Sequence, residues 1–430
     1  MKIEIIAIGD ELTSGRIINT TSSFAARRLF EAGFDIYAIH TIGDTPRLIG
    51  EAVRRALTHV DAVIVTGGLG ATDDDLTTEA ISNALGRPTA VNEEMLAAIR
   101  HHLRERSEQG AAGLPIRQTG ADHLEKLARL PRGAEALNPW GKMSGYRLVH
   151  NGKPIYFLPG IPSQMRRLLI DYVLPGLATW SDGQTSMIRQ RLFRIFGLPE
   201  IEVNRRIAAL ALPKTARLGY YPVFPDVHLN LVVRSMDGVE GLPATKQAGD
   251  AAFTGAVAMI EETLGEAIYG HNQETLSAVV GRRLLGKKLT LATAESCTGG
   301  MIGEWLTSTP GSSAWYLGGV ISYANQVKEG ALAVSKEMLA SHGAVSAEVA
   351  EAMAAGVRRL CRADLAISVT GIAGPDGGSD EKPVGTVYIG LADEQGTHAE
   401  RFLFDGGRRQ IREISAQTAL NIVRKRLAAP

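Results

Sequence analysis

Short apolar runs that end abruptly in glycine or polar residues recur along this chain, and a helical pattern follows each of them. Residues 2–8, 34–42 and 61–66 are three such runs. Thr45 and Pro46 give one of the helices between them a start signal, an N-cap followed by proline in the first helical position. Strands that alternate with helices at this spacing predict an α/β fold with a parallel sheet, whose ligands bind beyond the carboxyl ends of the strands.

Composition excludes several classes of protein. The 430 residues are 45% hydrophobic and 21% charged, which is enough material for two or three globular domains. Lys plus Arg and Asp plus Glu both number 46, so the chain lacks the basic excess of a nucleic-acid-binding protein. Its two cysteines, Cys297 and Cys361, cannot form a disulfide framework, and no apolar stretch is long enough to span a bilayer. No cleavage-type signal follows the first apolar run. We expect a cytoplasmic protein with neither a nucleic acid nor a membrane as partner.

The segment LTLATAESCTGG, from Leu289 to Gly300, combines a predicted buried strand with the start of a predicted helix. Between them, Ser296 and Cys297 occupy a tight turn, where free helix N–H groups are expected to point outward. A nucleophile in this turn would meet both a substrate and the positive end of a helix dipole.

A serine hydroxyl needs a neighbouring base to become a nucleophile. His342 and His398 are the histidine candidates in this part of the chain. Lys328 is another candidate, because burial can lower the pKa of a lysine far enough to supply a neutral amine. Cys297 is an alternative nucleophile, since a thiol at a helix N-terminus can have a lowered pKa. The residue pattern alone leaves these alternatives open.

A second group of candidate residues lies near the start of the chain, in TGGLGATDDDLT from Thr66 to Thr77. Glycines allow backbone amides to approach a phosphate, and carboxylates are ligands for a divalent ion. Asp10 and Glu11 follow the first predicted strand and are expected to face the same crevice. The alternative is that the three aspartates at 73–75 only cap the next helix and favour its dipole.

Three segments of this N-terminal part resemble the molybdopterin-binding-like domain of the CinA (competence/damage-inducible) family. They are GDELTSGRIINT, TGGLGATDDDLT and LPGIPSQM. Some members are reported as metal-dependent ADP-ribose pyrophosphatases, so the resemblance implies a divalent metal such as Mg, held by Asp74 and Asp75. The resemblance implies that Asp75 and Thr77 match the family's Asp-x-Thr pair, with Asp74 beside them. Together with five residues from the pattern, Asp10, Glu11, Gly67, Gly68 and Gly70, they make up the predicted nucleotide site. The chain departs from the family pattern at Ala71, at residues 19–21 and at the Lys142–Gly145 loop.

The C-terminal part resembles the CinA C-terminal domain, a PncC-type nicotinamide mononucleotide (NMN) deamidase. Six segments carry this resemblance in order: AESCTGG, PGSSAW, YAN followed by Lys328, HGAVS, GIAGPDGG and KPVGTVY. It implies hydrolysis of the NMN carboxamide to nicotinate mononucleotide and ammonia without a cofactor. Ser296 is then the nucleophile, Lys328 the base and Tyr323 their companion.

The same resemblance implies that Thr370 and an arginine of the final helix, Arg408, help to hold the substrate. The residue pattern adds five residues of the two glycine-rich loops and a second arginine to the predicted substrate site: Thr298, Gly299, Gly300, Gly371, Gly374 and Arg412. Glycine-rich loops, helix N-termini and an arginine pair suit the 5′-phosphate of NMN. Amides of the Cys297–Gly300 turn suit the oxyanion that forms when the carboxamide is attacked. The sequence does not separate the loop that binds phosphate from the loop that binds the oxyanion.

The predicted architecture has three parts. Residues 1–175 are a three-layer molybdopterin-binding-like domain with a parallel sheet, residues 176–270 a small α+β KH-like domain, and residues 271–430 an α/β deamidase domain. The middle part has no GxxG loop flanked by basic residues, so it is interpreted as a spacer or dimerisation domain of an expected homodimer.

Three functional hypotheses follow from these features. The first is an NMN deamidase in pyridine-nucleotide recycling, and the second a metal-dependent ADP-ribose pyrophosphatase in the N-terminal domain. The third is a non-enzymatic, competence-linked scaffold that binds nucleotides.

Overall fold

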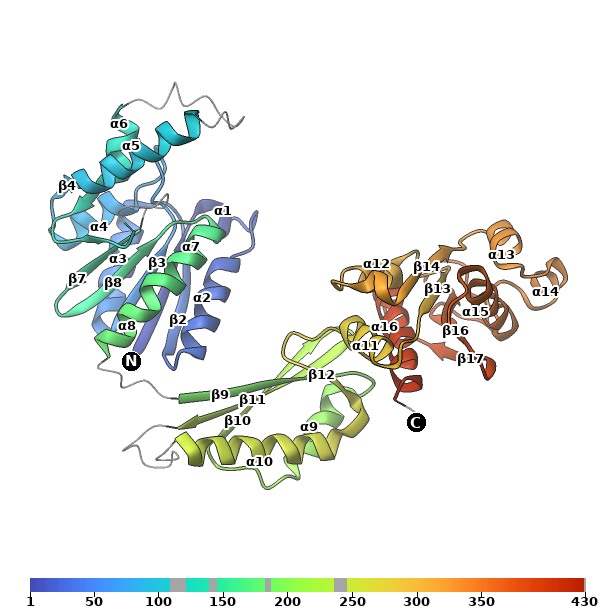
Figure 1. Ribbon diagram of the computed structural model, residues 1–430. Helices are drawn as coiled ribbons and strands as arrows, with labels where there is room; N and C mark the ends of the chain where they lie inside the picture. The colour runs from blue at the N-terminus through green and yellow to red at the C-terminus, as the bar shows by residue number, and fades with distance from the viewer. Residues whose placement is uncertain (109–120, 139–144, 182–186, 236–245, 429–430) are drawn as a thin grey trace. The chain divides into compact units, whose positions relative to one another are not determined.

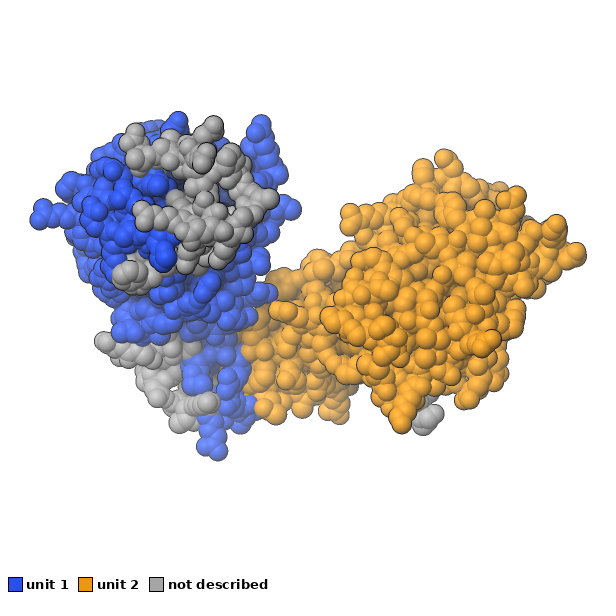
Figure 2. All heavy atoms as spheres, turned by 45° about the horizontal axis from the view of Figure 1, so that its top comes forward, with its two compact units in different colours: residues 1–189, 233–251 blue, residues 190–232, 252–430 orange. Residues whose placement is uncertain are grey.

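The computed structural model describes most of the chain, namely residues 1–108, 121–138, 145–181, 187–235 and 246–428. The chain packs as two compact units, one of residues 1–189 with 233–251 and one of residues 190–232 with 252–430 (Figure 2). The three-domain division of the sequence stays a prediction, because the two units share the middle segment between them. Within the described ranges, no helix combines the length and apolar character needed to cross a membrane.

A six-stranded sheet in the order β2-β1-β3-β8-β7-β6 is the centre of the first unit. β1 pairs in parallel with β2 and β3, and β3 with β8, whereas β7 and β6 continue the sheet antiparallel. The antiparallel extension was not predicted, and a two-residue hairpin turn with positive φ at Asn151 and Gly152 explains it. The strands are β1 (Lys2–Ile8), β2 (Asp35–Ile42), β3 (Ala62–Thr66), β6 (Glu135–Ala136), β7 (Tyr146–His150) and β8 (Lys153–Leu158).

Helices cover both faces of this sheet and give the predicted three layers (Figure 1). In β1, Ile3 and Ile5 belong to the core that contains Leu29, whereas Ile6 and Ile8 belong to the opposite core. Helices α2 (Thr20–Glu31), α7 (Pro162–Leu168) and α8 (Leu174–Trp180) contribute to the first core, and α3 (Pro46–His59) and α4 (Thr77–Leu85) to the second. Other elements of this unit are α1 (Asp10–Thr13), α5 (Glu93–Glu108), α6 (Ala121–Ala128), β4 (Thr89–Val91) and β5 (Arg129–Pro131).

The middle segment forms a four-stranded sheet in the order β10-β11-β9-β12, accompanied by two helices. This is a small α+β arrangement of the predicted kind, and β12 pairs antiparallel with β9. The elements are β9 (Met187–Ile195), α9 (Glu200–Ala208), β10 (Ala216–Val223), β11 (Asp226–Ser235), α10 (Lys246–Leu264) and β12 (Ile268–His271).

The C-terminal part has a five-stranded sheet in the order β14-β13-β15-β16-β17. β13 is parallel to β14 and β15, whereas β16 and β17 are antiparallel. One face of the sheet packs against α11, α12 and α16, and the other against α15. The spacing of Val349, Met353, Val357 and Leu360 predicts one apolar face on this helix; the first three are buried, whereas Leu360, in the last turn, is 55% exposed. The strands are β13 (Leu291–Glu295), β14 (Tyr316–Ile321), β15 (Leu365–Gly371), β16 (Thr386–Asp393) and β17 (Gly396–Leu403). The helices are α11 (Leu276–Lys287), α12 (Met301–Thr307), α13 (Asn325–Leu332), α14 (Lys336–His342), α15 (Ala347–Cys361) and α16 (Arg408–Arg426).

The apolar run from Val320 to Tyr323 predicts a strand over residues 320–323, and these bounds are wrong, because β14 spans Tyr316–Ile321. Ser322 directly follows β14, and its N–H still donates to the carbonyl of Glu295 on β13 at 2.7 Å. Ser322 and Tyr323 therefore lie in the connection between β14 and α13, beside the carboxyl end of β13.

Candidate active site

Ser296 directly follows β13, and the N–H of Ser296 donates to the carbonyl of Val369 on neighbouring β15 at 2.9 Å. The chain then reverses, with the N–H of Gly299 bonded to the carbonyl of Ser296 at 3.1 Å. Gly299 and Gly300 have φ of 63° and 91°, a region that favours glycine. This turn holds Ser296 at the carboxyl end of the central strands, where the α/β pattern predicted a ligand site.

Lys328 reaches Ser296 from α13, and its side chain is only 1% exposed. Its Nζ lies 3.1 Å from Ser296 Oγ, 2.5 Å from the carbonyl oxygen of Ser322 and 3.4 Å from that of Tyr323. Burial lowers the pKa of Lys328 below the usual value for lysine. A hydroxyl and a buried amine are thus in hydrogen-bond contact.

The two histidines considered as bases have other neighbours. His342 lies 3.3 Å from the carboxylate of Glu348, and His398 lies 4.0 Å from Glu400. Among the described residues, neither histidine makes a hydrogen bond to Ser296. Lys328 is therefore the base candidate that contacts the hydroxyl.

Cys297 is buried in the core and is only 5% exposed. Burial raises the pKa of its thiol to about 12, although the N–H groups of Cys297 and Thr298 lie close enough to lower it. A thiol with this pKa is protonated at neutral pH, and the thiolate is the form that attacks a carbonyl.

The turn is held by a carboxylate that sequence reasoning missed. Glu295 is 2% exposed, and it accepts hydrogen bonds from the N–H groups of Gly300, Ile302 and Gly303 at 3.0, 3.1 and 2.9 Å. The expectation of free N–H groups at this helix start is therefore wrong for these three amides, because the preceding residue of the chain already binds them. The sequence did contain a signal for this role, because Glu295 is an acidic residue at the end of an otherwise apolar strand.

Arg412 also supports the turn. Its guanidinium donates to the carbonyl oxygens of Cys297 and Thr298 at 3.1 and 2.8 Å. The Thr298 hydroxyl is fully buried and has no hydrogen-bond partner in the described parts of the chain. Thus Arg412 touches the backbone of the turn, and Thr298 retains an unused polar atom within it.

Arg408, at the start of α16, joins two other loops of the site. It donates to the carbonyl of Gly374 at 2.6 Å and to the Tyr323 hydroxyl at 3.0 Å. Tyr323 is 64% exposed, and its own carbonyl is one of the acceptors near Lys328. Tyr323 therefore contacts the lysine through its backbone and Arg408 through its side chain.

Thr370 and Lys382 hold the loop that follows α14 by hydrogen bonds to its backbone. The Thr370 hydroxyl donates to the carbonyl of Ala344 at 2.7 Å, and Lys382 Nζ donates to the carbonyls of His342 and Val345 at 3.0 and 2.8 Å. Lys382 was not predicted as a site residue. Gly371 follows Thr370, and a Cβ there would lie 2.9 Å from the carbonyl of Thr386, so close packing of β15 and β16 excludes a larger residue.

In the N-terminal domain, the predicted nucleotide residues largely bind one another. A Cβ on Gly68 would lie 2.1 Å from the Thr77 hydroxyl, which donates to the carbonyl of Gly67 at 3.0 Å. The Asp75 carboxylate accepts from the N–H and hydroxyl of Thr72 at 3.0 and 2.5 Å, and it fills the space beside Gly70. These glycines are therefore required by packing within the loop itself. The alternative that the aspartates cap α4 also lacks support, since the cap residue of α4 is Leu76 and accepts no side-chain bond.

Acidic side chains gather beside this loop. Asp10 and Asp44 exchange hydrogen bonds, Asp10 N to Asp44 Oδ2 at 2.8 Å and Asp44 N to Asp10 Oδ1 at 3.1 Å. Burial, followed by the charges of Asp10, Glu11 and Asp74, raises the pKa of Asp44. A hydrogen bond from Thr72 lowers the pKa of Asp74. Asp44 was not predicted as a site residue, because it is a single acidic residue after β2 and belongs to no recognisable motif.

These acids do not make a ready metal centre. Within the described residues, no three His, Cys, Asp or Glu side chains come together as ligands for a metal ion. The Oδ2 atom of Asp75 already accepts two hydrogen bonds from Thr72, which also bonds to Asp74. Among the described residues, the divalent metal implied by the family resemblance thus lacks a preformed ligand set.

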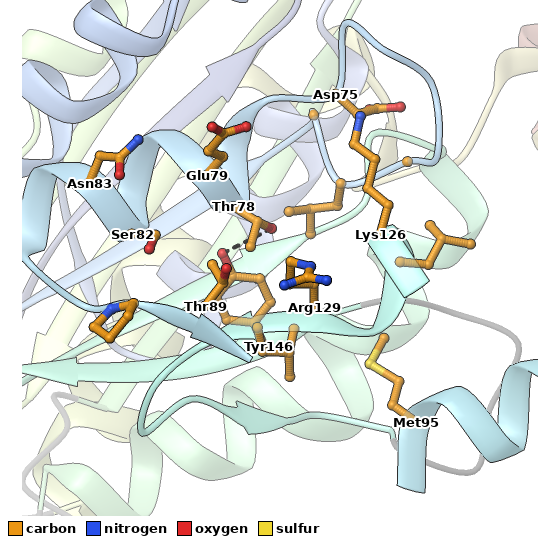
Figure 3. Close-up of a pocket in the computed structure, with 16 residues that line it drawn as sticks. Asp75, Thr78, Glu79, Ser82, Asn83, Thr89, Met95, Lys126, Arg129 and Tyr146 are labelled. Atoms are coloured by element: carbon orange, nitrogen blue, oxygen red, sulfur yellow. Dashed lines mark hydrogen bonds between the residues drawn. The ribbon is translucent and has the colours of Figure 1, made fainter. Parts of the chain in front are cut away.

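Two cavities adjoin at the glycine loop. One of about 500 Å³ is lined by acids such as Glu11, Asp44 and Asp74. The other, of about 430 Å³, lies between α4 and the α6–β5 segment, with Lys126 and Arg129 among its lining residues (Figure 3). Both are lined by Gly68, Leu69, Gly70, Asp75 and Leu127. Residues 142–144 of the diverged loop lie outside the described residues.

Comparisons with known proteins match this two-part organisation. Residues 273–427 match the family model of the CinA C-terminal domain, and residues 4–179 match that of a probable molybdopterin binding domain. A CinA-like protein of Desulfotalea psychrophila is 52% identical over 427 residues, which cover 99% of each chain. A CinA-like protein of Geobacter sulfurreducens is 38% identical over 429 residues, again covering 99% of each chain.

A solved structure resembles one part of the chain. The crystal structure of the competence damage-inducible protein A (ComA) from Klebsiella pneumoniae shares 37% identity, with a TM-score of 0.35. The match covers 36% of this chain and 95% of that one.

Proposed function

The chain belongs to the CinA family, and from this premise we propose that its C-terminal domain is an amidohydrolase that converts NMN to nicotinate mononucleotide and ammonia. The observation that carries the proposal is the contact of Ser296 Oγ with the buried Nζ of Lys328 at 3.1 Å. A buried amine with a lowered pKa is a suitable base for a serine nucleophile.

The surroundings of Lys328 suit this role. The carbonyls of Ser322 and Tyr323 accept two N–H bonds from Nζ. A neutral amine has two hydrogens and one lone pair, so the lone pair is left for the hydroxyl proton of Ser296. In this protonation state Ser296 donates to Lys328, as general-base catalysis requires.

The reaction then has two halves. Ser296 Oγ attacks the carboxamide carbon while its proton passes to Lys328, and the resulting oxyanion needs N–H donors in the turn. The Lys328 ammonium returns this proton to the leaving nitrogen, the C–N bond breaks, and ammonia departs from a nicotinoyl ester of Ser296. Water then attacks the ester, with Lys328 taking the water proton and giving it back to Ser296, and nicotinate mononucleotide is released.

The deamidase reaction should depend on pH through Lys328. Burial lowers its pKa, so protonated lysine should lose its proton at a lower pH than an exposed lysine does. We expect kcat for NMN to rise as the pH is raised through this lowered pKa and then to level off, because only the neutral amine accepts the serine proton. Ammonia release at saturating NMN across the pH range measures this, and a kcat that falls as the pH rises through this range would contradict the role of Lys328.

The two adjoining cavities at the glycine loop favour a second candidate function. We propose that the N-terminal domain binds an adenylate-containing nucleotide and cleaves ADP-ribose, as the second activity of a bifunctional enzyme. A ligand with two bulky parts joined by a pyrophosphate suits two cavities that share one wall. AMP release from ADP-ribose, measured with and without a chelator, tests this activity separately from ammonia release.

Within this second site, Asp75→Asn should weaken ADP-ribose binding about tenfold, which equals about 1.4 kcal/mol. The carboxylate bonds that hold Thr72 would be weakened, and a net loss of this size is usual for a bond to a charged group. Asp73→Asn is the matched control, since it removes a neighbouring exposed charge outside this contact. Calorimetric titration with ADP-ribose measures both variants, and equal affinities would contradict the prediction.

A further inference from the structure

Glu295 occupies an unusual position for a carboxylate, because it is buried directly before the residue that we propose as nucleophile. Its Oε2 accepts from Gly300 and Ile302, and its Oε1 accepts from Gly303. These N–H groups form the amino end of α12, where a helix attracts an anion. The chain thus supplies its own anion to the helix end beside Ser296.

This arrangement limits where a substrate can bind. A phosphate at the amino end of α12 would find three of its amides taken and a buried negative charge beside it. The N–H groups of Cys297 and Thr298 are different, since both lie close to the Cys297 thiol, which is a weak acceptor. An oxyanion formed on Ser296 can displace so weak an acceptor.

Arg408 and Arg412, two arginines of α16, also differ in what they bind. Arg412 donates to two carbonyl oxygens of the turn, where it supports the backbone. Arg408 donates to the carbonyl of Gly374 and to the exposed Tyr323 side chain. A phosphate could replace these two acceptors of Arg408, and the bond to an anion would be the stronger one.

Glu295 also supports the base. Its carbonyl accepts from Ser322 N at 2.7 Å, and the carbonyl of Ser322 accepts from Lys328 Nζ at 2.5 Å. One residue therefore holds the nucleophile turn through its side chain and the support of Lys328 through its backbone.

We propose that Glu295 is the positioning residue of this site, and that its carboxylate takes the place of an external anion at the amino end of α12. The carboxamide oxygen is thereby directed to the N–H groups of Cys297 and Thr298, and the substrate phosphate to Arg408. This orientation rests on the proposed deamidation of NMN.

The test compares Glu295→Ala, Glu295→Gln and the matched control Glu304→Gln, which neutralises an exposed carboxylate of α12. We expect kcat for NMN to fall about 100-fold in Glu295→Ala, the loss that a misplacement of about 1 Å can cause. The change in KM should be smaller, because the phosphate contact lies elsewhere. Glu304→Gln should behave like wild type.

Chemical rescue distinguishes positioning from a general loss of structure. Formate is small enough for the space that Glu295→Ala vacates, and it should restore a large part of kcat in that variant. It should not rescue Glu295→Gln, whose side chain fills the space, and it should not accelerate wild type. Thermal melting establishes that the variants are folded, and a folded Glu295→Ala that keeps wild-type kcat, or that formate does not rescue, overturns the proposal.

The proposed function can fail separately, if wild type releases no ammonia from NMN. The rate at which a fluorophosphonate probe labels Ser296 then becomes the readout, because it reports the turn without NMN. Slower labelling of Glu295→Ala that formate reverses supports the positioning role, and labelling at the wild-type rate overturns it.

Discussion

Replacing Ser296 by alanine is expected to lower NMN deamidation by on the order of 10⁴-fold or more, as the loss of a nucleophile that acts together with its base does in other hydrolases. Ser296 Oγ is the hydroxyl in contact with Lys328 Nζ, at 3.1 Å. Without it, no ester can form, and only binding and the oxyanion donors remain. Ammonia release under single-turnover and steady-state conditions measures the loss.

Cys297→Ala is the matched control for this prediction. The pKa of its buried thiol is raised to about 12, so little thiolate exists at neutral pH. We therefore expect Cys297→Ala to keep most of the activity, with some loss of stability because the thiol packs in the core. An inactive, folded Cys297→Ala beside an active Ser296→Ala would identify the cysteine as the nucleophile.

Replacing Lys328 by methionine should lower kcat by roughly 10²–10⁴-fold, the usual contribution of a general base. Methionine keeps most of the side-chain length and suits a buried position, but it cannot accept the serine proton. The pH dependence predicted for wild type should disappear with the amine. Steady-state ammonia release across the same pH range measures both effects.

Lys336→Met is the control for Lys328→Met, because Lys336 is an exposed lysine nearby in the chain at the start of α14. The double variant Ser296→Ala/Lys328→Met should be no less active than Ser296→Ala alone, since the two residues act as a unit. If Lys328→Met retains wild-type kcat, a different group must take the proton.

Much of the fold could be predicted from local patterns. β1 covers the predicted residues 2–8 completely, and α3 runs from Pro46 to His59 as its start signal indicated. Such elements depend on side-chain periodicity and on turn residues within a few positions of one another, so the chain itself carries the information. The antiparallel strands of the six-stranded and the five-stranded sheet were not predicted, because the direction in which two strands pair depends on which segments meet in space.

The same distinction between local pattern and spatial contact applies to the candidate sites. Motif positions predict Ser296, Lys328 and Arg408 as site residues, but they do not predict the partners of each side chain. Arg412 was expected at the substrate and instead holds the turn, because two carbonyl oxygens of that turn lie within its reach. In the N-terminal domain, Asp75 and Thr77 were expected at a nucleotide, and the structure directs both to their own loop.

The sequence by itself therefore determined that this chain is a CinA-type α/β protein and that a small polar turn follows a buried strand at Ser296. Only the tertiary structure decided that a lysine 32 residues further on is buried against that serine, and that Glu295 takes the amides of the next helix. The physical reason is that the protonation state of Lys328 and the hydrogen-bond partners of Glu295 depend on distance and exclusion of water. Both arise only when separate segments pack together.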